Sequence, residues 1–272
     1  AREHGGGDSA ASARAMGIRV ENGKVISRVI GRKRVLGVHV CLSSGEGETI
    51  ERIGCDAVAM SGGWSPVVHL WSHCGGKLEW NDESSMFCPD KSRPPTNENG
   101  ESFVETVGAA SGNTQLSEIV KEATELGLYI GRKFGGKQIR SNVPKVTPRL
   151  ENPVEPFWLM PRKAKRKLRN KTFLDFQNDV KISDVELAAR EGFESVEHLK
   201  RYTTLGMATD QGKLSNINGL AVLANALDSP ISKVGTTTFR PPYTPVSMGS
   251  IAGSARDSVF QPVRMSPIHS WH

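Results

Sequence analysis

The sequence predicts an α/β front half, then a small α-helical module and an extended tail. Three observations lead to this fold class. Alternating or β-branched runs separated by glycine-bearing turns occupy the first part of the chain, as is typical of strands. Helix start and stop signals are concentrated between residues 183 and 227, and the segment after Asp228 is rich in Gly, Pro, Ser and Thr. The length of 272 residues allows one large or two modest domains.

The first elements are a short helix and three strands. A glycine-rich loop precedes a helix expected from Ser9 to Met16, because Gly17 follows it as a stop signal. The strands are predicted at residues 25–30, 34–42 and 49–53, each alternating or β-branched.

Two strands that run into glycine turns are predicted next. Residues 56–60 form a short apolar run that leads into Ser61, Gly62, Gly63 and Trp64, and residues 103–107 lead into the turn at 108–112. The end of a buried strand is where an α/β sheet usually presents its ligand site. Adjacent glycines let the backbone approach a phosphate or ribose. A strand-terminating turn explains the same glycines without a ligand, so both interpretations stay open.

A helix and a basic segment complete the front half. Thr114 is expected to cap a helix with an apolar face of Leu116, Ile119, Val120, Ala123 and Leu126. Residues 134–171 are punctuated by Gly and Pro and are predicted to be a linker. Seven cations without an acid lie there: Arg162, Lys163, Lys165, Arg166, Lys167, Arg169 and Lys171.

This run accounts for the basicity of the chain, because removing it changes the net charge from +6 to −1. We interpret it as a solvated linker. Binding of RNA or acidic lipid through phosphate neutralisation is the alternative, but no aromatic residue interrupts the run.

The helical module is predicted from capping signals. Ser183 with Glu186 forms a capping box for a helix that stops at Gly192. Ser195 with His198 begins a second helix, which ends near Tyr202, and a third helix is expected over residues 215–227.

Cations, hydroxyls and a glycine meet where the second of these helices ends. The residues concerned are Lys200, Arg201, Thr203, Thr204 and Gly206. Such a set suits a phosphate-bearing ligand, because Lys and Arg supply charge and Thr supplies donors. A helix C-terminus that attracts cations explains the same residues without a ligand, so both interpretations stay open.

Other functional classes find little support in the residues. Cys41, Cys55, Cys74 and Cys88 lack the close pairs of a metal site and are expected to stay reduced. His69 and His73, four apart, have no matching carboxylate. No apolar run approaches the length of a membrane span, so a soluble, cytoplasmic protein is expected. Ala1 is not an initiator methionine, which we interpret as processing or excision.

Three segments carry a family resemblance. Residues 173–216 closely resemble the helical module in the alpha subunit of bacterial heterotetrameric sarcosine oxidases. The run CDAVAMSGGWSP at 55–66, followed by Val68, His69 and Leu70, looks like the corresponding segment of those subunits. The run TTFRPPYTPV at 237–246 is similar to their linker into a folate-binding aminomethyltransferase domain.

The resemblance implies a module without its metal. Relatives of this module, related to BFD-like domains, hold a two-iron, two-sulfur cluster with four cysteines, whose positions here are Asp175, Gln177, Asp210 and Ser215. None is the thiolate that such a cluster needs, so no iron-sulfur cluster is expected. Asp175 and Asp210 are expected to cap helices or to hydrogen-bond the former cluster cavity shut.

The resemblance also implies domains and cofactors. Residues 1–133 would be part of an NAD-binding, flavoprotein-disulfide-reductase-like α/β domain, 134–171 a basic linker, 172–228 the helical module and 229–272 an extended linker. NAD would contact Gly62, Gly63, Trp64, Gly108 and Ala109. The flavin mononucleotide FMN, at a subunit interface, would contact Lys200, Arg201, Thr203, Thr204 and Gly206. However, no G-x-G-x-x-G follows a strand and opens a helix in this chain.

The implied function is a share in sarcosine oxidation. The complete enzyme of this family demethylates sarcosine to glycine, forms hydrogen peroxide and passes the one-carbon unit to tetrahydrofolate. A beta-type flavoprotein subunit and smaller subunits would be partners, and the chain alone is expected to be inactive. Two alternatives stay open: a subunit of a related amine or opine dehydrogenase complex, or a truncated, non-catalytic interaction protein that uses the basic run.

Overall fold

Three antiparallel strands form the first sheet in the computed structural model, which describes residues 6–136, 143–147, 154–257, 260 and 263–272. The helix α1 (Gly7–Ala15) precedes β1 (Lys24–Gly31), β2 (Val35–Leu42) and β3 (Glu51–Gly54), and β2 lies in the middle. Val38, Val40 and Cys41 of β2 are buried. The helix and the three strands confirm the prediction for this segment.

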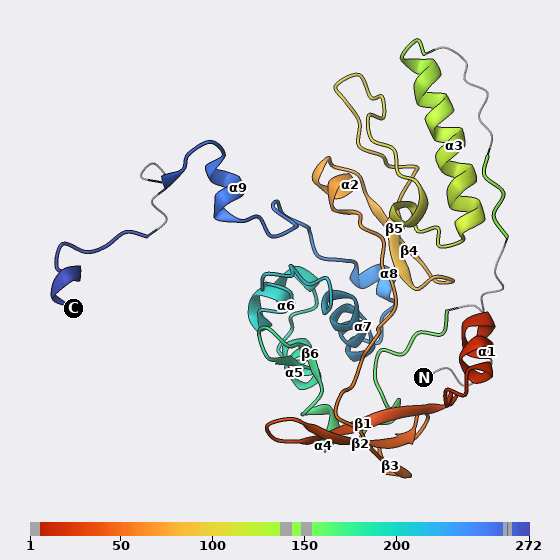
Figure 1. The fold of residues 1–272 in the computed structure, drawn as a ribbon, viewed down its shortest axis with the longest axis vertical. Coiled ribbons are helices and arrows are strands. Elements are labelled where there is room, and N and C mark those ends of the chain that lie inside the picture. Colours follow the sequence, from red (N-terminus) through yellow and green to blue (C-terminus); the bar gives the residue numbers. More distant parts are fainter. Residues whose placement is uncertain (1–5, 137–142, 148–153, 258–259, 261–262) are drawn as a thin grey trace.

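A helix, a hairpin and a long helix follow (Figure 1). The short helix α2 (His69–His73) leads into the antiparallel hairpin of β4 (Leu78–Asn81) and β5 (Met86–Pro89). The 3₁₀ turn η1 (Gly108–Ser111) then leads into α3 (Leu116–Lys133). Although α3 was predicted, it buries none of its residues and contacts η1 through Ile119.

Two of the predicted strands are absent. Residues 56–60 and 103–107 form no strand, and Asp56, Ala57, Ala59 and Met60 are exposed. The prediction of a buried strand at 56–60 was therefore wrong, because the apolar run has no neighbouring strand that would pair with it. The sheets of the described residues are antiparallel, so the expected strand-end ligand site of an α/β sheet is not formed there.

The basic run packs against the first sheet. The amides of Arg162, Lys163 and Lys165 donate to the carbonyls of residues 43, 45 and 46, in the turn after β2. The short helix α4 (Arg166–Arg169) follows, and Pro161 and Ala164 are buried.

Three of the seven cations have acidic partners. Arg162 pairs with Glu155, Lys165 with Glu46 and Glu48, and Arg169 with Glu186. Six of the seven cations are exposed, as a solvated run requires, although the backbone of residues 162–165 is hydrogen-bonded to the turn after β2. Glu46, Glu48 and Glu186 are distant in the sequence, so the run itself gave no sign of these partners.

The module holds the largest core. It begins with the hairpin of β6 (Phe173–Asp175) and β7 (Val180–Lys181) and continues with α5 (Ile182–Arg190), α6 (Val196–Thr203) and α7 (Asn216–Ala226). The core consists of Leu174, Val180, Ile182, Val185, Ala188, Val196, Leu199, Leu205, Leu220, Val222 and Leu223. The three helices were predicted, but the cap of α5 was not. Asp184 accepts the amide of Lys181, so Ser183 is not the N-cap.

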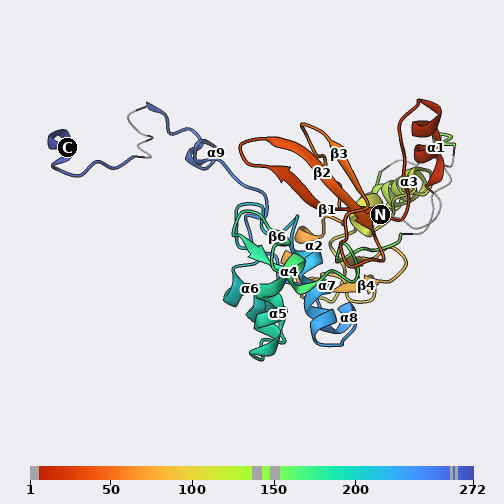
Figure 2. The same cartoon turned by 90° about the horizontal axis from the view of Figure 1, so that it is seen from below.

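The tail first returns to the body of the molecule and then leaves it. The helix α8 (Ile231–Val234) contacts β4 and α7, and Thr237 is buried. The later helix α9 (Met248–Ala252) and the turn η3 (His269–Trp271) lie on a segment that extends away from the other elements in both views (Figure 2).

Over the described part of the chain, no helix combines the length and the apolar character needed to cross a membrane. All four cysteines are free, and Cys41 and Cys88 are buried.

Candidate functional site

The loop at residues 61–64 is open to solvent. Gly62, Gly63 and Trp64 are all exposed, and 86% of the Trp64 surface is accessible. Gly63 has a φ of 103°, which favours glycine, and a Cβ on either glycine would meet nothing within 4 Å. The described part of the chain therefore leaves room for a ligand or another segment over this loop.

The loop at residues 108–112 is occupied by protein groups. The Gly108 amide donates to Glu122 of α3 at 2.9 Å, and the Ser111 hydroxyl donates to the same carboxylate. Burial acts to raise the pKa of Glu122, but these donors and the paired Lys91 ammonium together outweigh it and hold that pKa below its ordinary value. The Glu122 carboxylate thus already accepts the hydrogen bond of the Gly108 amide, which was expected to face a ligand phosphate. Ala109 stays exposed. No hydrogen bond or ring contact joins this loop to residues 61–64 within the described ranges.

The stretch with cations and hydroxyls forms the end of α6. Arg201 pairs with Glu197, and the Thr203 hydroxyl donates to the carbonyl of Leu199. Thr204 adopts the left-handed conformation with φ of 63°. These bonds are those of a helix C-terminus, and Lys200 has no hydrogen-bond or ion-pair partner in the described structure.

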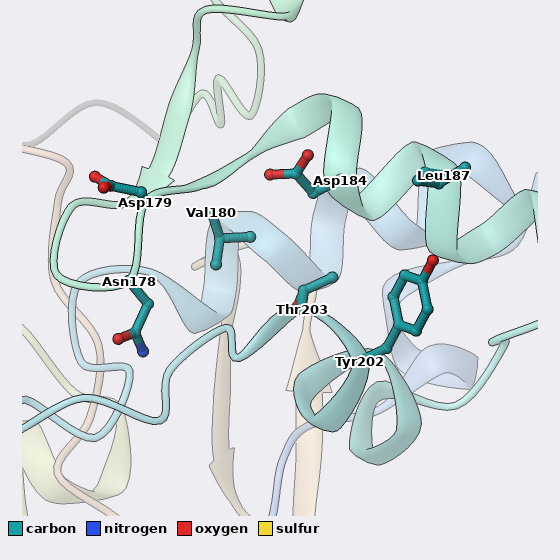
Figure 3. A pocket seen from close by; sticks show the side chains of 7 residues that line it. All are labelled: Asn178, Asp179, Val180, Asp184, Leu187, Tyr202 and Thr203. Carbon is teal, nitrogen blue, oxygen red and sulfur yellow. The ribbon is translucent and has the colours of Figure 1, made fainter.

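A cavity of about 310 Å³ lies beside this helix end (Figure 3). Tyr202 and Thr203 of α6 face it across from Asp184 and Leu187 of α5. The remaining lining residues are Asn178, Asp179 and Val180. Two carboxylates and no cation line the cavity, so it does not suit a phosphate. A phosphate on Lys200 and Arg201 would lie outside it.

Asp175 ties the module together. Its carboxylate accepts the amides of Gln177 and Asn178 at 2.9 and 3.1 Å, and the buried amide of Gly206 at 2.9 Å. Only 3% of the residue is exposed. Asp210 accepts the amides of Gly212 and Leu214. Both aspartates therefore accept backbone amides within the module, while their expected relation to a former cluster cavity stays a prediction.

Asn216 is enclosed beside these aspartates. Its side chain lies between Gly206 and Gly212, where a Cβ on either glycine would collide with it. Its Nδ2 donates to the hydroxyl of Thr237 at 2.9 Å, and both groups are buried. The hydroxyl of Ser215, which is 1% exposed, has no hydrogen-bond partner in the described structure. Among the residues that the structure describes, no group of three or more His, Cys, Asp or Glu side chains could hold a metal ion.

An aromatic cluster joins the front half, the module and the tail. The rings of His69 and His73 lie 5.7 Å apart, and His69 stacks on Tyr243 at 4.4 Å. The Lys213 ammonium lies over the Tyr243 ring, 4.4 Å from its centre. Burial lowers the pKa of His69, and the charges of His73 and Lys213 lower it further. The spacing of the two histidines predicted a shared helix face, but Tyr243 is too distant in the sequence to be predicted as their partner.

A second cavity lies between the β4–β5 hairpin and α8, and sequence reasoning missed it. The hairpin that forms one wall has a local sequence pattern. Leu78 to Asn81 and Met86 to Pro89 flank a polar turn, as is typical of two paired strands. The residues of α8 and the following linker that face the hairpin gave no sign, since their position depends on the tertiary fold.

Comparisons with known proteins give a consistent result. Residues 169–254 match the model of the sarcosine oxidase A3 domain. The chain is 42% identical to the sarcosine oxidase subunit alpha of Rhizobium meliloti (strain 1021) over 83% of this chain and 22% of that protein. It is 35% identical to the subunit alpha of Corynebacterium sp. (strain P-1) over 97% of this chain and 27% of that protein. The chain thus spans about a quarter of the length of these relatives.

A solved structure supports the fold. The L-proline dehydrogenase from P. horikoshii matches with a TM-score of 0.60 and 19% identity, over 89% of this chain and 47% of that one. The mixed α/β fold of this chain therefore resembles part of the fold of that dehydrogenase.

Proposed function

We infer that this chain takes part in the oxidative demethylation of sarcosine, because it is homologous over most of its length to the alpha subunits of sarcosine oxidases. In this proposal the chain is a structural part of an alpha subunit, and it works in a complex with a beta-type flavoprotein subunit and smaller subunits. The complex would form hydrogen peroxide and pass the one-carbon unit to tetrahydrofolate.

The observation that carries the proposal is the identity of 42% and 35% to two alpha subunits, over 83% and 97% of the chain. The match of residues 169–254 to the A3 domain agrees with it. The chemistry of amine oxidation is assigned to the beta-type flavoprotein subunit, as the family resemblance implies.

One half of the proposal concerns NAD. We assign NAD to Gly62, Gly63, Trp64, Gly108 and Ala109. The open space above Gly62 and Gly63 supports this assignment, as does the exposed ring of Trp64, which could stack on a flat group. The Gly108 amide could bind NAD only if its hydrogen bond to Glu122 broke. The loop at residues 61–64 is therefore the stronger part of the assignment.

The other half concerns FMN. We assign its phosphate to Lys200, Arg201, Thr203, Thr204 and Gly206, at an interface with the beta-type subunit. The support is the exposed end of α6, where Lys200 has no acidic partner in the described structure and Arg201 is exposed over 55% of its side chain. Chemistry on the flavin itself would be supplied by the bound cofactor.

The test is reconstitution. The 272-residue chain is assayed for oxygen uptake with sarcosine, first alone and then with a beta-type subunit of one of the relatives. We expect no turnover from the chain alone and joint elution of the two chains in size-exclusion chromatography. Sarcosine oxidation by the purified chain alone would contradict the proposed division of labour.

Variants test the FMN assignment within the same complex. Lys200→Ala together with Arg201→Ala should lower the FMN content of the complex about tenfold, which corresponds to the loss of about one charge-assisted contact. Lys121→Ala, an exposed lysine on α3 without an ion pair in the described structure, is the matched control. Equal FMN content in both variants would remove the assignment and leave the homology untouched.

A further inference from the structure

The cavity between the hairpin and the tail has the size of a small-ligand site. It measures about 530 Å³, within the roughly 300–1,000 Å³ of typical ligand pockets. One wall comes from α2 and the β4–β5 hairpin, the other from α8 and residues 235–238, and α8 contacts β4 in the fold (Figure 1). None of the residues assigned above to NAD or FMN lines this cavity.

Backbone hydrogen bonds position two cations that line this cavity. The Lys77 amide donates to the carbonyl of Arg93 at 3.1 Å, and the Lys77 carbonyl accepts the amide of Asp90 and the indole N–H of Trp71. Gly76 lies against the Trp71 ring, where a Cβ would collide with it. Lys77 and Arg93 both line the cavity, and these hydrogen bonds fix their backbones without involving the Lys77 ammonium.

The charges of these cations are available to a ligand. The Lys77 ammonium has no hydrogen-bond or ion-pair partner in the described structure. Arg93 uses its Nε for Asp90, and within the described residues its two terminal nitrogens stay available to an oxyanion. The hydroxyl of Ser92 and the guanidinium of Arg93 lower the pKa of Asp90 to about 2, so this carboxylate stays ionised and holds Arg93 in place. Glu79 contributes an opposing negative charge to the same cavity.

Hydroxyls and aromatic rings complete the lining. Ser72, Ser232 and Thr236 line the cavity, and none of their hydroxyls makes a hydrogen bond within the described structure. Trp80 and Phe87 also line it, with ring centres 5.1 Å apart and edges facing. Unpaired hydroxyls near cations suit phosphate oxygens, and aromatic rings suit a flat apolar group.

We propose that this cavity binds a phosphorylated ligand with a flat aromatic ring, of the size of a mononucleotide. The phosphate lies against Lys77 and Arg93, and the ring lies against Trp80 and Phe87. The hydroxyls of α8 and of the linker reach the ligand from the tail, so binding also fastens residues 232–238 to the hairpin.

The experiment is calorimetric titration of the 272-residue chain with adenosine 5′-monophosphate at low salt. Inorganic phosphate and adenosine are titrated separately, because they carry the two halves of the ligand. We expect adenosine 5′-monophosphate to bind more tightly than either half. Lys77→Gln should weaken its binding about tenfold, and Glu79→Gln should strengthen it two- to threefold through the loss of like-charge repulsion. Lys121→Gln on α3 is the matched control and should leave binding unchanged.

The opposite signs of the two substitutions distinguish a binding site from a structural role. Lys77 and Glu79 are both exposed, and neither has an ion pair in the described structure, so both variants should fold. The proposal would be overturned if no saturable binding were seen up to about 10 mM adenosine 5′-monophosphate. Such an affinity would be weaker than that of typical small-molecule substrates and cofactors. Equal affinity of Lys77→Gln and Lys121→Gln would overturn it as well. Phosphate that binds as tightly as the nucleotide would also overturn it, since the aromatic wall would then contribute nothing. None of these results bears on the FMN content of the complex.

Discussion

Replacement of Asp175 by Asn tests whether a single carboxylate holds the module together. One Asp175 oxygen accepts the amides of Gln177 and Asn178, and the other accepts the buried amide of Gly206, 31 residues further along the chain. An asparagine can keep one oxygen as an acceptor, but its NH₂ group would then face a second donor. One of the two sets of amides must therefore lose its partner.

The expected loss follows from the number and burial of these bonds. A buried donor without an acceptor costs about 1–3 kcal/mol, and the loss of charge on the remaining acceptor adds about 1 kcal/mol. We therefore expect Asp175→Asn to lower the free energy of unfolding by about 2–4 kcal/mol. Asp175→Ala removes all three bonds and leaves a small void, so its loss should reach about 3–5 kcal/mol.

Urea denaturation followed by far-UV circular dichroism measures both variants. Asp179→Asn is the matched control: it lies in the same turn and is exposed, and its φ of 55° is one that asparagine tolerates. The control should move the transition by less than about 0.5 kcal/mol. If Asp175→Asn is as stable as Asp179→Asn, the carboxylate does not hold the hairpin to Gly206, and the reasoning is refuted.

Three further predictions concern the module, the tail that packs on it and His69 of α2. Gly212→Ala should lower the free energy of unfolding by about 2–5 kcal/mol, because φ is 76° and the new Cβ would collide with Asn216. Gly192→Ala, with φ of 89° and open space around the new Cβ, should lower it by only about 1–2 kcal/mol. Urea midpoints of the two variants measure the difference, and equal losses would contradict the prediction. Thr237→Val should cost about 1–3 kcal/mol, since it leaves the buried Nδ2 of Asn216 without an acceptor; a neutral result in thermal melts would show that this bond does not fasten the tail. The pKa of His69 lies below its ordinary value of 6.5, so the unfolded state binds more protons than the folded state as the pH falls through about 6.5. The free energy of unfolding should therefore fall with pH in this range. Urea midpoints between about pH 8 and 5 should show this slope, and His69→Gln should reduce it.

The elements that could be predicted are those whose signals are local. The periodic apolar face of α3, the glycine stop after α5 and the alternation in β2 each depend on a few neighbouring residues. The strand predicted at 56–60 failed because a short apolar run requires a neighbouring strand, and the fold provides none. The β4–β5 hairpin had a local signal that was not used, whereas its proximity to α8 had none.

The candidate sites divide in the same way. The order of residues alone indicated the family, because segments such as 55–66 and 173–216 preserve specific runs, and the comparisons agree. It also indicated that Asp175 and Asp210 form hydrogen bonds. It did not reveal that Glu122 occupies the Gly108 amide, since that partner lies 14 residues away on another element.

The sequence by itself determined which family the chain resembles and where most helices begin and end. Only the tertiary structure decided that the basic run packs against the first sheet, that Tyr243 stacks on His69, and that Lys77 and Arg93 share a cavity with α8. The physical reason is that capping and periodicity act within a few residues, whereas these contacts join segments whose proximity depends on the packing of the whole chain.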